Sequence, residues 1–504
     1  MRAGSSIGQS ARRGRGWEAW VSVPGLRRDD GRNARSRIGG SSRGARRLPV
    51  AGVRFGLALG ALLHAGCDRA GPTEPLAPAA AARTTHSPAT ATIATSHDAD
   101  VAIEWLRLSF ELTRAEALVP PVAARAYAYT GVTLWEAVVP GVVGGQSLAG
   151  QLNGLAALPA AAQDLHWPTV LNAAAAAITH RFYTSGRSTA AIRQLEHRFQ
   201  NRFRGAIPGQ QFGRSVAHGQ RVANAIWQWS RTDGFRQLDD CPYTPPTGPG
   251  MWTPTPPDFE APVQPCWGSL RPFVLRAAGD CAPPLHPAYS EDPGSEFHQE
   301  AIEVYDVVRN LTAEQRTIAL YWADLAGESA TPAGHSLSIT AQVLEQIDAP
   351  LDVAAEAFAK VGIGESDAFI ACWATKYHYN LLRPVTWIQK VVDLAWEPLL
   401  DTPPFPAYTS GHSNDAGASS MILTALFGDA FAFTDHTNDD RGFAPRSFGS
   451  FFEAANESAI SRLYGGIHYR SDIEQGLAQG QCIGRAVNAL VFGTPALVAT
   501  SGGD

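Results

Sequence analysis

The sequence predicts an all-α protein with one large helical domain, and three observations support that class. Apolar residues recur at helical spacing through most of the chain after Asp98. Segments with the strict alternation of apolar and polar residues that marks β-strands are hard to find. The chain has 504 residues, of which 45% are hydrophobic and only 17% charged, enough apolar material for a sizeable core. We therefore expect a helix-bundle domain over residues 98–500.

Helical segments follow one another along this domain. We expect helices around Val101–Leu112, Val122–Val139, 168–183, 187–203, 213–231, 294–309, 313–327 and 335–348. The 313–327 segment opens with Thr312 and Gln315 at the spacing of a capping box. Residues 240–292 are crowded with proline and aromatic residues, so we expect a long loop excursion over the surface there.

Residues 1–67 have the pattern of an export signal. An arginine-rich head precedes the apolar run 55–63, which is too short to span a bilayer, and small residues then lead to Cys67. Cys67 is either lipidated, as in bacterial lipoproteins, or close to an ordinary cleavage site. Residues 68–97 are rich in Ala, Thr, Pro and Ser, which predicts a flexible tether. We expect an exported protein, periplasmic, envelope-anchored or extracellular, that touches a membrane only through a lipid at Cys67.

The net charge and the cysteines limit the kinds of protein that this chain could be. The net charge of −6 and the pI near 6.2 argue against a nucleic-acid-binding protein. An exported protein permits a disulfide among three cysteines of the proline-rich region, Cys241, Cys266 and Cys281, although the sequence does not identify the pair. Cys372 and Cys482 fall in helical patterns, and we expect them to be small core residues.

Three later segments contain candidate functional residues, and the first of them includes Lys376 and Arg383. They are seven positions apart, and at roughly 100° per residue this spacing places both on one face of a helix. We expect Trp373 and Asn380 on that face and Pro384 to end the helix, because proline has no amide hydrogen. Two cations on one helix face usually lie on a solvated surface. The apolar flanking residues favour burial, and a buried Lys–Arg pair requires an anion.

The second segment places Ser410, Gly411 and His412 directly before an apolar helical stretch, 416–427. A helix N-terminus offers backbone amides and the positive end of the helix dipole to an anion. Gly411 allows close approach of the backbone, Ser410 adds a hydroxyl, and His412 can exchange a proton near neutral pH. In isolation, the segment favours a plainer interpretation, with Ser410 as an ordinary helix cap and His412 as a surface histidine.

The third segment contains Arg462, His468 and Asp472. On a continuous helix Arg462 and His468 would point roughly 120° apart, but the Gly465-Gly466 pair interrupts the helix and lets both side chains turn into one cavity. Asp472 lies one turn after His468. It either orients a neighbouring side chain or complements the helix dipole as a first-turn acid, and the sequence favours neither role.

Together and in order, these segments resemble the signature shared by vanadium-dependent haloperoxidases and type 2 phosphatidic acid phosphatases. That signature is Lys, six residues, Arg-Pro; then Pro-Ser-Gly-His; then Ser-Arg, five residues, His, three residues, Asp. Here it reads Lys376 to Arg383-Pro384, Thr409-Ser410-Gly411-His412, and Ser461-Arg462 to His468 to Asp472. Thr409 replaces proline at a position that shapes the turn. The resemblance implies the helix-bundle fold of the haloperoxidase type.

The resemblance also implies a role for each residue around a bound vanadate. The oxygens that do not react would be held by Lys376, Arg383, Ser410, the Gly411 amide and Arg462. His468 would bind the vanadium, His412 would act as acid or base at the apical oxygen, and Lys376 would polarise the peroxide. The implied reaction is oxidation of halide by hydrogen peroxide to hypohalous acid, with a small organic acceptor left open.

The alternative reaction in the same pocket is phosphomonoester hydrolysis through a phosphohistidine at His468. Trp373 and Phe405 match the apolar residues that line the halide side in the family's peroxidases, which favours the peroxidase; simple core packing is the other explanation for them. The intact motif set argues against a catalytically silent binding protein. Asp324 is a weaker candidate for the acid that orients Arg462, with a capping or surface role equally open.

Overall fold

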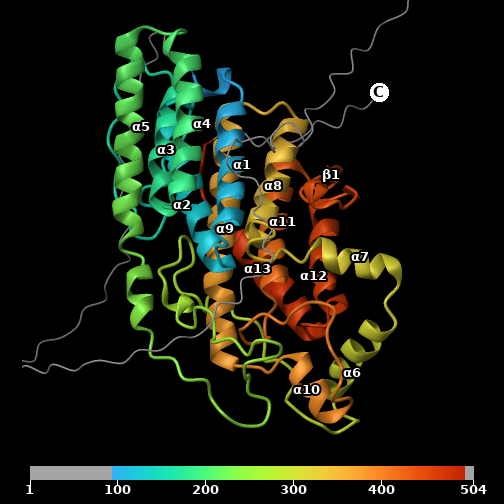
Figure 1. Ribbon diagram of the computed structural model, residues 1–504. Helices are drawn as coiled ribbons and strands as arrows, with labels where there is room; N and C mark the ends of the chain where they lie inside the picture. The colour runs from blue at the N-terminus through green and yellow to red at the C-terminus, as the bar shows by residue number, and fades with distance from the viewer. Residues whose placement is uncertain (1–92, 494–504) are drawn as a thin grey trace, which may run out of the picture. The chain divides into compact units, whose positions relative to one another are not determined.

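The computed structural model describes residues 93–493. Within them the chain forms thirteen α-helices and one two-stranded sheet, which confirms the all-α prediction (Figure 1). The export signal, the Cys67 site and residues 68–92 of the expected tether lie outside the described residues. The folded domain begins before residue 98, because Ala94 is buried and the Thr95 hydroxyl donates to Asp352 at 2.6 Å.

The helices agree with the sequence in order and, with two exceptions, in extent. They are α1 (Asp100–Ala115), α2 (Pro120–Val138), α3 (Trp167–Phe182), α4 (Gly186–Arg204), α5 (Gly209–Ser230), α6 (Glu296–Arg309), α7 (Ala313–Tyr321), α8 (Thr331–Gln346), α9 (Leu351–Tyr379), α10 (Pro384–Val391), α11 (Gly411–Phe427), α12 (Phe451–Tyr464) and α13 (Arg470–Asn488). Strands β1 (Phe433–Asp435) and β2 (Arg446–Phe448) pair antiparallel. Among these described helices, none is long and apolar enough to cross a membrane.

The first exception is α7, which begins with the predicted capping box but ends at Tyr321 instead of residue 327. Asp324 soon follows with a φ of 47°, a left-handed conformation that an α-helix does not contain. The chain therefore leaves the helix early and carries Trp322 and Asp324 on an irregular segment before α8.

The second exception is α9, which runs through the middle of the domain between α2 and α11 (Figure 1). We expected this helix to continue through Arg383 and to end at Pro384, and that was wrong. Asn380 adopts a left-handed conformation with φ 50° and caps the helix after Tyr379. Pro384 instead begins α10, where its missing amide hydrogen costs nothing. Lys376 and Arg383 therefore do not share one helix face.

Close packing of α11 against α13 brings two of the signature segments together. A Cβ added at Gly480 would lie 2.0 Å from the Asn414 carbonyl oxygen, and one added at Gly417 would lie 2.5 Å from the Leu477 carbonyl oxygen. Only glycine permits this approach of the two backbones. As a result the Ser410 amide, at the start of α11, donates to the Asp472 carbonyl at 2.9 Å, in the first turn of α13.

The proline-rich region between α5 and α6 is a long excursion with no α-helix among its described residues. Its Trp252 and Trp267 are buried, so they anchor it to the core. Two disulfides, Cys241–Cys266 and Cys281–Cys482, fix it further. Our prediction that Cys482 is an unpaired core residue was wrong, because its partner lies 201 positions earlier in the chain. Cys372 is free and buried, as expected.

Gly480→Ala should destabilise the protein because its methyl group would force α11 and α13 apart. We expect a loss of about 1–3 kcal/mol in the free energy of unfolding, measured by denaturant titration. Gly213→Ala is the matched control, since an added Cβ meets nothing within 4 Å at that position of α5; it should be neutral or stabilise by about 0.5–1 kcal/mol. Equal effects of the two substitutions would contradict the close packing described here.

Candidate active site

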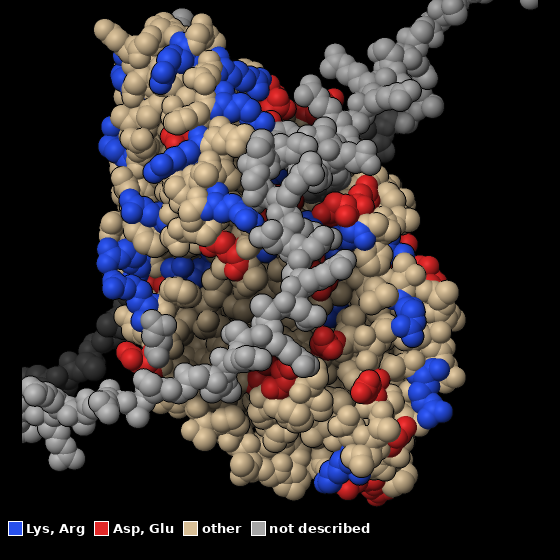
Figure 2. Space-filling view, in the orientation of Figure 1, with Lys and Arg blue, Asp and Glu red and all other residues tan. Residues whose placement is uncertain are grey.

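The three signature segments meet in one buried cluster of side chains, which we call the pocket. Lys376 comes from the last turn of α9, Arg383 from the segment before α10, and Arg462 from the last turn of α12. Ser410 caps α11, with its Oγ accepting the Ser413 amide, and His468 lies just before α13. All five residues are at most 3% exposed. Figure 2 shows a basic surface over α4 and α5, which is formed by exposed arginines. The five buried residues are not part of that surface.

The three cations are held by backbone carbonyls. Lys376 Nζ donates to two carbonyls of the loop before α11, at 2.9 and 2.8 Å. Arg383 donates to the carbonyls of Phe405 and Ile467, each at 2.7 Å, and Arg462 donates to that of Trp322 at 2.6 Å. Within the described chain none of the three forms an ion pair with a carboxylate.

Burial without a counter-ion is costly for each of these cations. Burial lowers the pKa of Lys376, and it lowers the pKa of Arg383 and of Arg462 to about 10 each. An anion in the pocket would reverse these shifts, because an opposite charge nearby favours the protonated form. The electrostatics therefore suit an oxyanion with more than one negative charge.

Hydrogen bonds fix the tautomer of His468. Its Nε2 lies 3.1 Å from Arg383 Nη1, and its Nδ1 lies 2.9 Å from Asp472 Oδ2. A guanidinium group only donates, so Nε2 accepts and the ring proton sits on Nδ1, facing the carboxylate. Burial and the nearby cations, first Arg383, hold the pKa of His468 well below its ordinary value. The Nε2 lone pair therefore stays available on the side of the cations.

Asp472 combines the two roles that the sequence left open. Its Oδ2 accepts from His468 and also from the Tyr469 amide at 3.0 Å, so the same oxygen orients the histidine and caps the start of α13. A histidine that binds a metal commonly donates its other ring N–H to such a carboxylate, which fixes the orientation of the ring.

His412 and Arg462 both have a buried nitrogen without a partner among the described residues, Nε2 and Nε respectively. Burial, and then Arg462, hold the pKa of His412 well below its ordinary value, while Asp324 acts in the opposite direction. Gly411 is not required by packing, because a Cβ there would make only an ordinary 3.6 Å contact with Trp373. Unpaired donors, a helix N-terminus and three cations fit a tetrahedral or bipyramidal oxyanion.

An aromatic wall stands beside these cations. The rings of Trp373 and Phe405 lie 4.9 Å apart between centroids. Lys376 Nζ is 5.1 Å, and Arg383 Cζ 4.9 Å, from the centre of the Phe405 ring, so both cations contact its face. Trp373 is buried and Phe405 is partly exposed. The pair therefore makes an apolar border on the side of Lys376.

Two sequence predictions for the site differ from the structure. Asn380 does not face the pocket, since its side chain bonds to the Tyr377 carbonyl and to the Tyr243 hydroxyl. Asp324 does not hydrogen-bond to Arg462; its carboxylate accepts from His335 instead, with both oxygens 3.1 Å from Nδ1. His335 and Asp435, which contact each other, could not be recognised from the sequence, because no local pattern links residues so far apart.

These features define a helical-bundle protein with a pocket suited to an oxyanion, and comparisons with known proteins give the family. The model of the VCPO second helical-bundle domain matches residues 356–394 and 389–493. The chain is similar to a bacterial vanadium-dependent iodoperoxidase of known structure, with 36% sequence identity and a TM-score of 0.75, over 79% of this chain and 98% of that one. The chain belongs to the vanadium-dependent haloperoxidase family.

More distant structures share the fold. A bacterial vanadium-dependent chloroperoxidase in its holo form is 15% identical, with a TM-score of 0.56 over 74% of this chain and 92% of that one. Its apo form gives 14% identity and a TM-score of 0.55. A search of curated proteins found no match to this chain.

Asp472→Ala should weaken anion binding because His468 loses the acceptor that fixes its proton on Nδ1. We expect the dissociation constant for phosphate, measured by isothermal titration calorimetry, to rise roughly 10- to 100-fold. Ser450→Ala is the control: it also removes an N-cap, that of α12, but has no contact with the pocket. If both variants bound phosphate like the wild type, the orienting role of Asp472 would be wrong.

Proposed function

We propose that this protein is a vanadate-dependent haloperoxidase that uses hydrogen peroxide to oxidise a halide to hypohalous acid. The observation that carries the proposal is the set of three buried cations around the unprotonated Nε2 of His468, none of which pairs with a carboxylate of residues 93–493. Membership in the haloperoxidase family supports vanadate as the anion, and we set the phosphatase alternative aside because the related structures are peroxidases.

The residues present fit vanadate. Lys376, Arg383 and Arg462, together with the hydroxyl of Ser410 and the amide of Gly411, would hold its oxygens, and His468 Nε2 would bind the metal centre. Vanadate bound there would supply an electrophilic centre that activates hydrogen peroxide for attack by the halide. The three cations stabilise the negative charge in a site where burial strengthens each interaction.

His412 is suited to proton transfer. Burial and Arg462 favour its neutral form, so it can accept a proton from incoming peroxide. Asp324 Oδ2, 3.9 Å from His412 Nε2, compensates the charge when the proton arrives. Lys376 Nζ lies 5.9 Å from the centre of the Trp373 ring and 5.1 Å from that of the Phe405 ring. Beside this cation, the two rings would offer a polarisable, weakly hydrated border to the halide.

The halide and the compartment form part of the proposal. Iodide is the halide to test first, since the 36% identical relative is an iodoperoxidase. Two disulfides suit an oxidising compartment and support export, with the lipid anchor at Cys67 as the proposed membrane attachment. A small organic acceptor for the oxidised halide is compatible with the same chemistry.

Purified protein loaded with orthovanadate should oxidise iodide, and more slowly bromide, when hydrogen peroxide is added. Turnover is followed by triiodide absorbance and by halogenation of a phenol dye. Phosphate added during loading should reduce the activity, because it competes for the same cations. The proposal fails if vanadate-loaded protein shows no halide turnover while the untreated protein hydrolyses an aryl phosphate.

His468→Ala and His412→Ala should separate binding from turnover. His468→Ala removes the ligand to the metal centre, so it should abolish activity and weaken vanadate binding at least 10-fold. His412→Ala should leave vanadate binding within about threefold of the wild type yet lower kcat roughly 100-fold or more, because only proton transfer is lost. Equilibrium dialysis and steady-state kinetics measure the two quantities. An equal loss of both in the two variants would contradict this division of roles.

A further inference from the structure

The proposed reaction needs the Asp324 carboxylate beside His412 but does not explain what holds it there. The Asp324 side chain is buried and its φ of 47° is one that residues other than glycine rarely adopt. In the described residues its carboxylate accepts hydrogen bonds from one group alone, the Nδ1 of His335. The position of Asp324 beside His412 therefore depends on His335.

His335 is held between two carboxylates. Its Nδ1 lies 3.1 Å from both oxygens of Asp324, and its Nε2 lies 2.7 Å from Asp435 Oδ2. An ionised carboxylate only accepts, so both ring nitrogens must donate and the ring is an imidazolium. Burial opposes this charge, but Asp324 and Asp435 outweigh it and raise the pKa of His335 to about 10. The ring also stacks on Trp322, with centroids 4.3 Å apart.

Hydrogen bonds from several groups hold the Asp435 carboxylate in place. Asp435 is the last residue of β1, and its Oδ2 also accepts the Tyr321 hydroxyl at 2.7 Å. Its Oδ1 accepts the Thr437 amide at 2.9 Å and the Thr437 hydroxyl at 2.6 Å. The Gln342 side-chain amide also donates to Oδ1, at 3.4 Å. With five donors on one carboxylate, Asp435 has little freedom. His335 is therefore anchored on its far side and can hold Asp324 on its near side.

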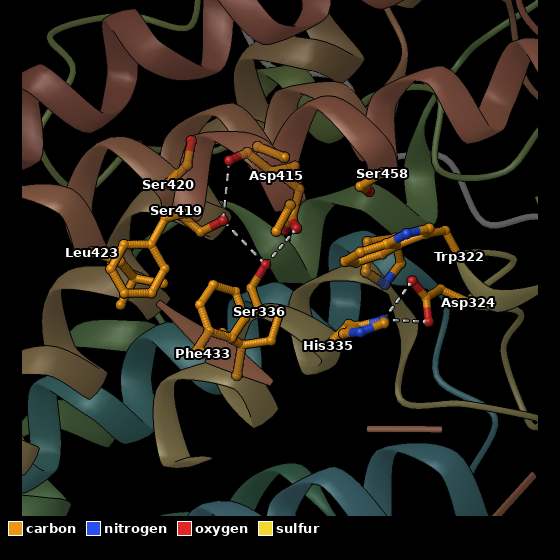
Figure 3. A pocket seen from close by; sticks show the side chains of 16 residues that line it. Trp322, Asp324, His335, Ser336, Asp415, Ser419, Ser420, Leu423, Phe433 and Ser458 are labelled. Atoms are coloured by element: carbon orange, nitrogen blue, oxygen red, sulfur yellow. Dashed lines mark hydrogen bonds and ion pairs between the residues drawn. The ribbon is translucent and has the colours of Figure 1, made fainter. Parts of the chain in front are cut away.

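A small cavity borders the same residues (Figure 3). It has a volume of about 30 Å³ and is lined by Asp324, His335, Ser336 and Asp415 among others. That is room for about two water molecules. Packing alone does not confine the Asp324 carboxylate, because this space lies next to it. The hydrogen bond from His335 is what keeps it near His412.

The charged and titratable groups around this arrangement come from several elements. Tyr321 and Asp324 belong to α7 and the segment after it, Asp435 to β1, His412 and Asp415 to α11, and Arg462 to α12. The Asp324–His335–Asp435 unit has a net charge of −1, since two carboxylates flank one imidazolium. Its Asp324 oxygen lies 3.9 Å from His412 Nε2 and raises the pKa of His412, whereas Arg462 lowers it. Arg441, after β1, acts on Asp324 and lowers its pKa.

We propose that His335 is a positioning residue: an imidazolium anchored by Asp435 that fixes the Asp324 carboxylate against His412. This inference rests on the proposed function, in which His412 exchanges a proton during turnover. The hydrogen bonds of His335 go to Asp324 and Asp435 and not to any residue that would hold vanadate. It acts by keeping a negative charge at a set place, so that His412 gains stabilisation when it is protonated.

Two isosteric substitutions of His335 distinguish this role from a structural one. In His335→Asn the side-chain amide stands where Nδ1 stood and can still donate to Asp324. In His335→Gln the amide stands where Nε2 stood and donates to Asp435, leaving Asp324 without its donor. We expect kcat to fall roughly 10- to 100-fold in His335→Gln and clearly less in His335→Asn, with the vanadate dissociation constant within about threefold of the wild type in both.

A role limited to packing predicts equal losses of kcat in the two variants, or the greater loss in His335→Asn, and either result would overturn the proposal. His218→Gln, at a buried histidine of α5 outside the site, controls for the loss of a buried imidazole and should keep wild-type turnover. Thermal midpoints of all three variants identify any general loss of folding.

A measurement without vanadate tests the charge state independently of activity. In ¹⁵N-histidine-labelled protein, one imidazole should keep both ring protons at pH 8, and its signal should be absent from His335→Gln. Asp435→Asn should lower the pH at which this imidazole deprotonates, because one of the two flanking charges is removed. A His335 ring that is neutral at pH 7 would overturn the proposal even if the enzyme oxidises halide. Conversely, a doubly protonated His335 in a protein that oxidises no halide would refute the proposed function and not the charge state.

Discussion

The structure depends on three buried cations that form no ion pair with a carboxylate of residues 93–493. Lys376, Arg383 and Arg462 donate only to backbone carbonyls or to a histidine nitrogen, and those carbonyls belong to the irregular segments around the pocket. Each cation therefore holds a loop in place, and each loop orients a cation. The arrangement leaves positive charge in a site of low polarity, where an unpaired charge is expensive. A multiply charged oxyanion would complete it, and this requirement would explain why three cations are buried around one site.

The two histidines of the pocket are each backed by a carboxylate, but at different distances. His468 Nδ1 is 2.9 Å from Asp472, a hydrogen bond that fixes one tautomer, as a metal ligand requires. His412 Nε2 is 3.9 Å from Asp324, too far for a hydrogen bond but close enough for charge compensation. The looser contact suits a residue that gains and loses a proton. The difference between the two contacts thus matches the different tasks assigned to the two histidines.

The sequence predicted the site better than it predicted the local geometry that builds it. Motif spacing brought together the residues of three segments, and their apolar neighbours indicated burial. The prediction that Lys376 and Arg383 share one helix face was nevertheless wrong. Asn380 ends α9 with a left-handed conformation that helical periodicity does not reveal. Long-range pairs were missed for a similar reason. Asp435 meets His335 across 100 positions, and Cys482 meets Cys281 across 201, and no local pattern encodes either contact.

The same cations would serve vanadate or phosphate, so the difference between a peroxidase and a phosphatase has to lie in what borders them. Lys376 and Arg383 both contact the face of Phe405, and Trp373 packs against that ring. A phosphate ester brings a polar leaving group that needs hydrogen-bond partners, and aromatic faces offer none. A halide is small, polarisable and more weakly hydrated, so it loses less on reaching an apolar border beside two positive charges. The wall would therefore favour halide beside Lys376 and Arg383, and this preference would link the charge of the site to halide oxidation.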